Sequence, residues 1–269
     1  MTQSPNSAYT LAELCIAACA EAWRDDGEVL ATGITPIPRL AAGLAKKTFN
    51  PALMMTDAEV FLVDEPVPMG PRGDYQIKPE GWMSYARTFD NIYGGKRHAL
   101  VAPVQIDRFG QTNISTIGAR DKPKAALLGV RGYPGNSISH ANSYFLPSHD
   151  TRALVAGEVD FVCSVGYNPA RWPGGKKPPY LDLRIIVTNL GVLDFGGKDN
   201  AIRVKSLHPG VTFEEMQTGT GFPLERPDHI PITPPPTDEQ LHLIRVALDP
   251  HGVRASVFKG DPPAIRAQA

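Results

Sequence analysis

The fold is decided by TLAELCIAACAEAW at residues 10–23, followed by GEVLATG at residues 27–33 and PRLAAGLAKK at residues 38–47. Thr10, with Glu13 three residues on, is a capping box, so a helix is predicted over residues 9–23. Residues 28–32 are predicted as a strand. A second helix follows, with Pro38 in its first turn and lysines in its last. This alternation predicts an α/β fold: a mostly parallel central sheet flanked by helices.

Outward from this stretch, further apolar runs are predicted to be strands. They are residues 52–55, 98–104, 125–130, 153–156, 161–165, 183–187 and 202–207. Two late helices are predicted to begin after Thr212 and Thr237, each followed by Glu or Gln three residues on. Many of the 26 prolines lie in residues 167–180 and 222–237, which we expect to be a loop and an extended strap. We expect one domain over residues 1–269, with its core at about 9–250 and a tail over 251–269.

Composition excludes several classes of protein. The net charge of −1 gives no basic surface for nucleic acid or an anionic membrane. No window is long and apolar enough for a membrane span, and no basic residue precedes residues 11–23, so no secretory signal is expected. The cytoplasm is the expected location. The three cysteines are too few for a disulfide framework, and the histidines lack metal-ligand spacing, so no metal is expected.

Two acidic residues follow the predicted strand at residues 52–55. Asp57 and Glu59 are candidates for catalysis, because ligands of α/β sheets bind at the carboxyl ends of strands, where partial burial can raise a carboxyl pKa. The alternative is that Asp57 caps a turn and Glu59 is solvated. The P-loop, the dinucleotide-binding fingerprint and the nucleophile elbow are all absent from the sequence.

A second candidate site is the loop GVRGYPGNSISH at residues 129–140. Its glycines, Gly132 and Gly135 among them, let backbone N–H groups approach a ligand closely, as in an oxyanion hole. Arg131 can clamp an anion by two parallel hydrogen bonds, and Asn136 and His140 add polar groups. A glycine-rich turn without a ligand is the alternative.

A third block, QIDRFGQTN at residues 105–113, is by itself consistent with a tight turn. Together with LHPGVT and TGTGF near residues 207–222, it resembles the β subunits of class I CoA-transferases of the glutaconate type, over roughly residues 9–250. The resemblance carries Gln105, Asp107, Gly110 and Asn113 into the family signature. It implies a single CoA-transferase-like domain that builds its active site together with an α subunit. In that family a β-subunit glutamate attacks the acyl-CoA; here the shorter Asp57 stands in its place.

Longer stretches resemble one branch of the family, the two-subunit steroid ring-cleaving hydrolases. They are TDAE at residues 56–59, EGWM at 80–83, GVRGYPGN at 129–136 and NLGVLDFGG at 189–197. The branch implies a hydrolase acting in cholesterol or bile-acid breakdown. Water would open a carbon–carbon bond of the residual C and D rings of a CoA thioester, next to a ketone. CoA would enter as part of the substrate, with no other cofactor, and the partner would be an α-type subunit in an α2β2 complex.

The resemblance also implies which residues of the two subunits act in the reaction. The essential carboxylate is expected on the α subunit. Arg131, with Asn136 and the backbone of residues 132–135, is expected to bind substrate or stabilise an oxyanion, and Asp57 and Glu59 to line the pocket. Further candidates for contacts with the substrate or CoA are Gln105, Asn113 and His140. Two alternatives stay open: a CoA-transferase with Asp57 or Glu59 as nucleophile, and a non-catalytic scaffold for the α subunit.

Overall fold

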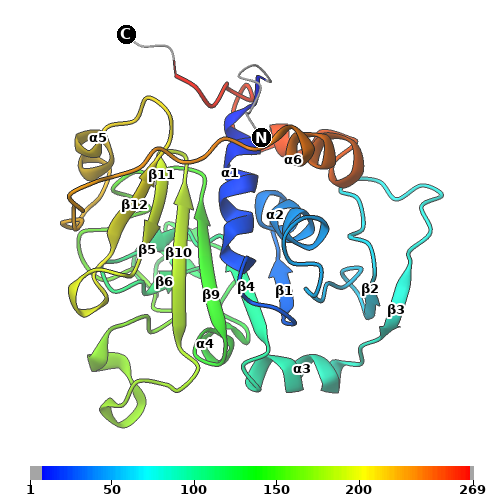
Figure 1. Cartoon of the computed structure of the whole chain (residues 1–269). Coiled ribbons are helices and arrows are strands. Elements are labelled where there is room, and N and C mark those ends of the chain that lie inside the picture. The colour runs from blue at the N-terminus through cyan, green and yellow to red at the C-terminus, as the bar shows by residue number, and fades with distance from the viewer. Residues whose placement is uncertain (1–7, 267–269) are drawn as a thin grey trace.

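The computed structural model describes residues 8–266. Its centre is a six-stranded sheet in the order β1-β4-β9-β10-β11-β12 (Figure 1). These strands are β1 (Leu30–Gly33), β4 (Arg97–Val101), β9 (Ala141–Leu146), β10 (Asp182–Thr188), β11 (Gly191–Asp194) and β12 (Arg203–Leu207). The first four run parallel, and β11 and β12 are antiparallel to their neighbours. The mostly parallel sheet that the sequence predicts is confirmed.

Three small antiparallel pairs and several helices complete the fold. The pairs are β2 (Phe61–Val63) with β3 (Pro79–Trp82), β5 (Gln105–Ile106) with β6 (Thr112–Asn113), and β7 (Thr116–Ile117) with β8 (Ala125–Ala126). The α-helices are α1 (Leu11–Ala20), α2 (Pro36–Lys47), α3 (Tyr85–Tyr93), α4 (Tyr133–Ser137), α5 (Phe213–Thr218) and α6 (Asp238–His242). The π-helical turn η5 (Leu243–Leu248) extends α6, and five 3-10 turns are η1 (Glu21–Trp23), η2 (Pro169–Arg171), η3 (Pro173–Gly175), η4 (Lys198–Asn200) and η6 (Val253–Ser256).

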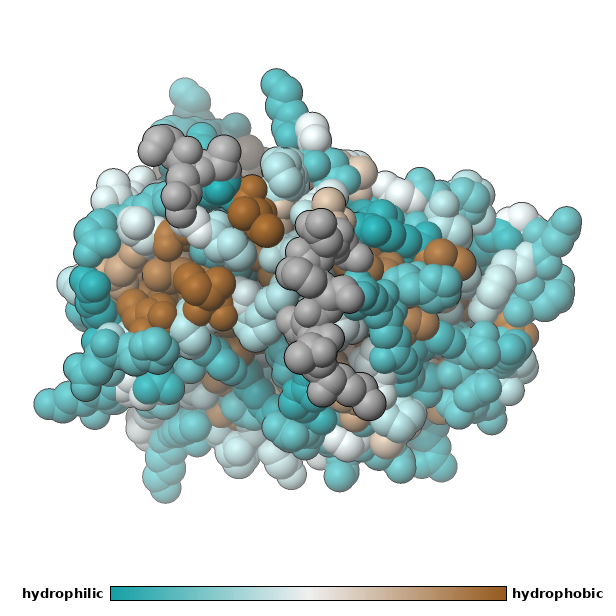
Figure 2. Space-filling view, turned by 45° about the horizontal axis from the view of Figure 1, so that its top comes forward, coloured by the Kyte–Doolittle hydropathy of each residue, from teal (hydrophilic) through white to brown (hydrophobic). Residues whose placement is uncertain are grey.

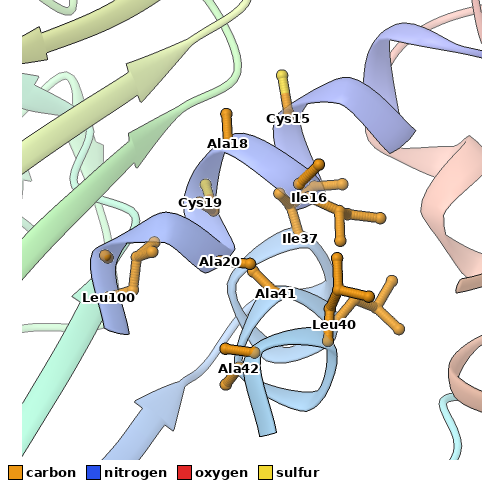
Figure 3. Close-up of a cluster of buried hydrophobic side chains, with 14 of the residues drawn as sticks. Cys15, Ile16, Ala18, Cys19, Ala20, Ile37, Leu40, Ala41, Ala42 and Leu100 are labelled. Atoms are coloured by element: carbon orange, nitrogen blue, oxygen red, sulfur yellow. The ribbon is translucent and has the colours of Figure 1, made fainter. Parts of the chain in front are cut away.

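The helical layer on one face comes from the stretch that decides the fold. The capping box of α1 forms as predicted: Thr10 accepts from the backbone N–H of Glu13, and Glu13 accepts from that of Thr10. Figure 3 shows apolar side chains of α1 and α2, Cys19 and Leu40 among them, gathered in one buried cluster. Cys15 is buried as well, and the cysteines are free thiols. This burial orders the two helices against the sheet.

Three predicted strands, at residues 52–55, 153–156 and 161–165, do not form, and the one at residues 125–130 forms only in part. Residues 52–55 contribute one bridge, between Met54 and Leu30, and residues 153–156 and 161–165 contribute one bridge each. Of residues 125–130, only the exposed pair in β8 is extended. These runs are apolar for another reason: several of them cover the sheet instead of joining it, and Leu154, for example, is fully buried against the second face.

Different elements pack against the two faces of the sheet. Side chains alternate along β4, so Leu100 packs with α1 and α2, while Ala99 and Val101 face the opposite cluster. That opposite face is covered by small hairpins, α5 and the proline-rich strap, which runs beside β12 through a bridge between Leu207 and Ile232. Residues 127–140 lie over the β1–β4 end of this face and form a loop that contains the short helix α4. A loop fills the space less completely than a long helix, which leaves room for a cavity.

The segment expected as a tail packs against the start of the chain. The backbone N–H of Leu11 donates to the carbonyl of Pro262 at 2.8 Å, and that of Ala264 donates to Tyr9 at 3.1 Å. Phe258 is buried in the core, edge-on to Phe145. The face near both chain ends is mostly hydrophilic, with small separate hydrophobic patches (Figure 2). In residues 8–266, no helix is long and apolar enough to cross a membrane.

Candidate functional site

A cavity of about 310 Å3 lies at the β1–β4 end of the sheet. Its floor is formed by alternate side chains of β4: Arg97, Ala99 and Val101. Its roof is the loop of residues 127–136, and the turn from β1 into α2 closes one side. The lining is largely apolar, so the cavity suits a hydrophobic ligand held by a few polar groups.

The roof contains several candidates found from sequence. Arg131, Gly132 and Asn136 line the cavity. Arg131 has a φ of 45°, a left-handed conformation that is uncommon for a residue other than glycine and that clusters at functional sites. Its exposed side chain makes no hydrogen bond or ion pair within residues 8–266. Asn136 Oδ1 and Thr35 Oγ1 are shielded from solvent and lack a hydrogen-bond partner among the described residues, although both residues line the cavity.

A polar corner stands at the start of β4. Arg97 Nε donates to Thr32 Oγ1 at 2.9 Å, and Arg97 Nη1 lies 3.4 Å from His140 Nε2. His140 Nδ1 lies 2.9 Å from the carbonyl oxygen of Ala141, to which it donates, so Nε2 is the acceptor for Arg97. Burial lowers the pKa of His140 to about 4, so this ring is neutral at pH 7. Burial likewise lowers the pKa of Arg97 to about 10.

Asp57 and Glu59 lie outside the cavity lining. Asp57 is only 2% exposed, and its Oδ1 accepts the backbone N–H groups of Glu59 at 2.9 Å and Phe61 at 3.2 Å. The backbone carbonyl of Asp57 accepts from Arg72. Between the acidic residues Ala58 has a φ of 78°, and Glu59 itself is exposed. The carboxylate of Asp57 thus fixes the turn that follows the Met54 bridge.

The other sequence candidates are spread around the cavity. His140 lines it, whereas Gly135 sits behind the roof, where an added Cβ would lie 3.6 Å from the Tyr93 hydroxyl. Gln105 and Asn113 are buried in the β5–β6 hairpin, outside the lining, and Asn113 Nδ2 donates to Gln105 Oε1 at 2.8 Å. The structure therefore brings Arg131, Gly132, Asn136 and His140 together in one place.

Asp26, His98 and Ser143 have the order of hydrogen bonds of a hydrolase catalytic triad, but their side chains are buried. His98 Nδ1 lies 2.6 Å from Asp26 Oδ2, and His98 Nε2 lies 2.9 Å from Ser143 Oγ. Both His98 and Ser143 are fully buried, and Asp26 also pairs with Arg184. Burial lowers the pKa of His98 in spite of its hydrogen bond to Asp26. Because Ser143 is fully buried and does not line the cavity described above, we assign these residues to the core.

Sequence reasoning missed Arg97. The signal was weak: Arg97 is a charged residue immediately before the apolar run of residues 98–104, where it is consistent with a strand boundary. Its partners, Thr32 and His140, lie 65 and 43 residues away in the chain, so no local motif contains all three. Within residues 8–266, no cluster of His, Cys, Asp and Glu is arranged to hold a metal ion.

Comparisons with known proteins place this geometry in a family. No protein-family model matches the chain. The cholesterol ring-cleaving hydrolase IpdB subunit of Mycobacterium tuberculosis is 40% identical over 245 residues, which are 91% of this chain and 97% of that protein. The crystal structure of IpdAB from Rhodococcus jostii has a TM-score of 0.85 at 37% identity, covering 94% of this chain and 99% of that one.

A more distant relative defines the wider group. Glutaconate CoA-transferase from Acidaminococcus fermentans has a TM-score of 0.76 at 25% identity and covers 91% of this chain and 96% of its own. The CoA-transferase-like fold that the sequence motifs imply is therefore confirmed. The near-complete coverage at 40% identity shows that the chain belongs to the IpdB family, a branch of the CoA-transferase β subunits.

Proposed function

We propose that this chain is the β subunit of a heteromeric hydrolase that opens a ring carbon–carbon bond of a steroid-derived CoA thioester in cholesterol or bile-acid breakdown. CoA enters as part of the substrate, and no separate cofactor takes part. The partner is an α-type subunit, in an α2β2 complex. The proposal places the complex in the cytoplasm, which the free, buried cysteines support, since thiols stay reduced there.

The burial and hydrogen bonding of Asp57 favour a hydrolase over a transferase. A nucleophilic carboxylate must reach the thioester carbon with a free oxygen. Asp57 is buried and does not line the cavity; its Oδ1 accepts two backbone N–H groups, and its Oδ2 lies 3.9 Å from Arg72 Nη1. This carboxylate is suited to holding a turn, which leaves water as the attacking group.

The cavity supplies binding and charge stabilisation. Water adds to a ring ketone, so the carbonyl oxygen becomes an oxyanion. The adjacent carbon–carbon bond then breaks, the electron pair moves to the neighbouring carbon, and that carbon takes the proton that water lost to a base. The ketone carbon ends as a carboxylate. The apolar lining holds the rings, and Arg131, at the roof, faces negative charge on the substrate or on the opening ring.

The test uses the complex coexpressed with its α-type subunit, given a ring-bearing CoA thioester in isotopically labelled water. A hydrolase places one labelled oxygen in the new carboxylate. Asp57→Asn, which keeps an acceptor oxygen for the turn, should lower kcat less than about tenfold, whereas loss of a nucleophile costs on the order of 10,000-fold or more. A borohydride-reducible CoA thioester on Asp57 or Glu59 would instead establish the transferase.

The variant Arg131→Ala tests whether this chain contributes to catalysis or is a non-catalytic scaffold for the α subunit. Because Arg131 is exposed and forms no hydrogen bond or ion pair with the other described residues, its removal should leave assembly and thermal stability unchanged. We expect kcat/KM to fall about tenfold or more, the value of a hydrogen bond to a charged group. Arg152→Ala, at a surface side chain that is 88% exposed, is the control and should have full activity. Full activity in Arg131→Ala would favour the scaffold.

A further inference from the structure

The charge of Arg97 has no counter-charge among the residues that the structure describes. No Asp or Glu within residues 8–266 forms an ion pair with it, whereas Arg184 and Arg203, which also start strands or lie near their starts, both pair with aspartates. In the described part of the chain, its guanidinium forms hydrogen bonds only with the hydroxyl of Thr32 and the neutral ring of His140. A guanidinium carries more N–H donors than these two contacts use, so donors remain free beside the cavity.

The surroundings make this isolation costly. The cavity beside Arg97 is lined mainly by apolar groups such as Ala99, Val101 and Val104. A cation removed from water without a partner is destabilising, and the lowered pKa of Arg97 has this cause. An anion placed against the free donors would remove the penalty and gain a charge-assisted hydrogen bond.

We infer that Arg97, held by Thr32 and His140, is a second anion-binding residue of the cavity, on its floor opposite Arg131, and receives a carboxylate-type oxygen of an otherwise apolar ligand. The inference rests on the proposed function for the identity of that ligand. In ring opening, the oxygen is the one that begins as the ketone, becomes the oxyanion and ends in the new carboxylate. His140 is a positioning residue, because its neutral Nε2 orients the guanidinium without competing for the anion.

A ligand pair tests the site without the reaction. Cyclohexanecarboxylate and cyclohexanemethanol share an apolar ring and differ in charge. We expect the α/β complex to bind the acid about tenfold more tightly than the alcohol, measured by calorimetry or ligand-observed NMR. Arg97→Met should lose this preference, while Arg152→Met, at an exposed arginine outside the cavity, should keep it. An equal affinity of the wild type for both ligands, or a preference for the acid that survives in Arg97→Met, would overturn the inference.

Kinetics then show where the anion comes from. If it forms during ring opening, Arg97→Met lowers kcat on the order of 100-fold with little change in KM. If the substrate already carries it, KM rises and kcat is kept. Unchanged kcat and KM would contradict the inference. Thermal unfolding is the folding control: loss of an unpaired charge should not lower the Tm of Arg97→Met, and Arg152→Met should match the wild type in every assay.

The two proposals fail in different ways. A wild-type complex that opens no ring would remove the proposed function, while the acid and alcohol affinities would still decide on Arg97. An active complex whose Arg97→Met variant keeps both wild-type turnover and the preference for the acid would refute the anion site and leave the hydrolase standing.

Discussion

Replacing Gly33 by alanine is expected to abolish ring opening and to lower the free energy of unfolding of the complex by about 3 kcal/mol. Gly33 ends β1 where the chain turns into α2. A Cβ there would lie 2.3 Å from the carbonyl carbon and oxygen of Pro38 and 2.5 Å from the backbone nitrogen of Arg39. These are backbone atoms of the first part of α2, so no side-chain rotation can relieve the overlap.

Relief requires α2 to move away from the sheet or β1 to shift. Either movement displaces Thr32, which supports Arg97, and Thr35, which lines the cavity. The measurements are denaturant unfolding and kcat of the assembled complex. Gly157→Ala is the matched control, because a Cβ at Gly157 meets nothing within 4 Å and should leave both values unchanged. Wild-type unfolding and turnover in Gly33→Ala would show that the turn between β1 and α2 has room for a methyl group.

Glu13→Gln is expected to destabilise the protein by about 3 kcal/mol at pH 7. The side chain of Glu13 is 1% exposed and accepts from Arg245 at 2.7 and 2.8 Å and from Arg254 at 3.2 Å. A glutamine keeps the shape but removes the charge, which leaves the largely buried Arg254 with only Asp249 as a carboxylate partner. Loss of a buried partner is costly for this reason, even where an intact buried pair adds little.

The pH dependence identifies the cause. Burial opposes ionisation of Glu13, but the hydrogen bonds from Arg245 and the Thr10 backbone and the charges of Arg245 and Arg254 together outweigh it, so the folded-state pKa is lowered. The stabilisation by the Glu13 carboxylate is therefore complete above the unfolded-state pKa of about 4.3. It is lost as the pH falls through the folded-state pKa. Wild type and Glu13→Gln should converge in acid. Glu21→Gln, which breaks an exposed pair with Arg24, should cost less than about 1 kcal/mol; an equal loss in both variants would argue against the buried pair.

The parts of the fold that sequence predicted are those fixed by local chemistry. The capping residues Thr10 and Thr237 act on backbone groups three residues away, so their helices begin where the pattern indicates. The strand β9 went unpredicted because Asn142 and Ser143 are polar, yet both are fully buried at the centre of the sheet. Asn142 donates to the carbonyls of Ser137 and His140, and Ser143 contacts His98. Distant partners make a polar strand possible, and a single sequence does not display them.

The residues of the candidate site also fall into those that a local sequence pattern indicates and those that depend on distant partners. The roof loop was found because Arg131 and Asn136 stand among glycines, a pattern that is visible within a few residues. The floor was not, because Arg97 gains its role only when β1, β4 and the residue before β9 come side by side. Conversely, Gln105 and Asn113 carry the family signature but satisfy each other inside a hairpin. A motif can mark a family through its architecture as well as through its chemistry.

The pairing of Glu13 with Arg245 has a consequence for the order of events in the cell. The two residues are 232 positions apart, so a ribosome adding about 5 to 20 residues per second needs roughly 10 to 50 s to produce the second after the first. Until then, the carboxylate of Glu13 lacks the guanidinium that pairs with it in the folded protein. A chain cut before residue 245 would therefore lack the ion pair that joins α1 to η5.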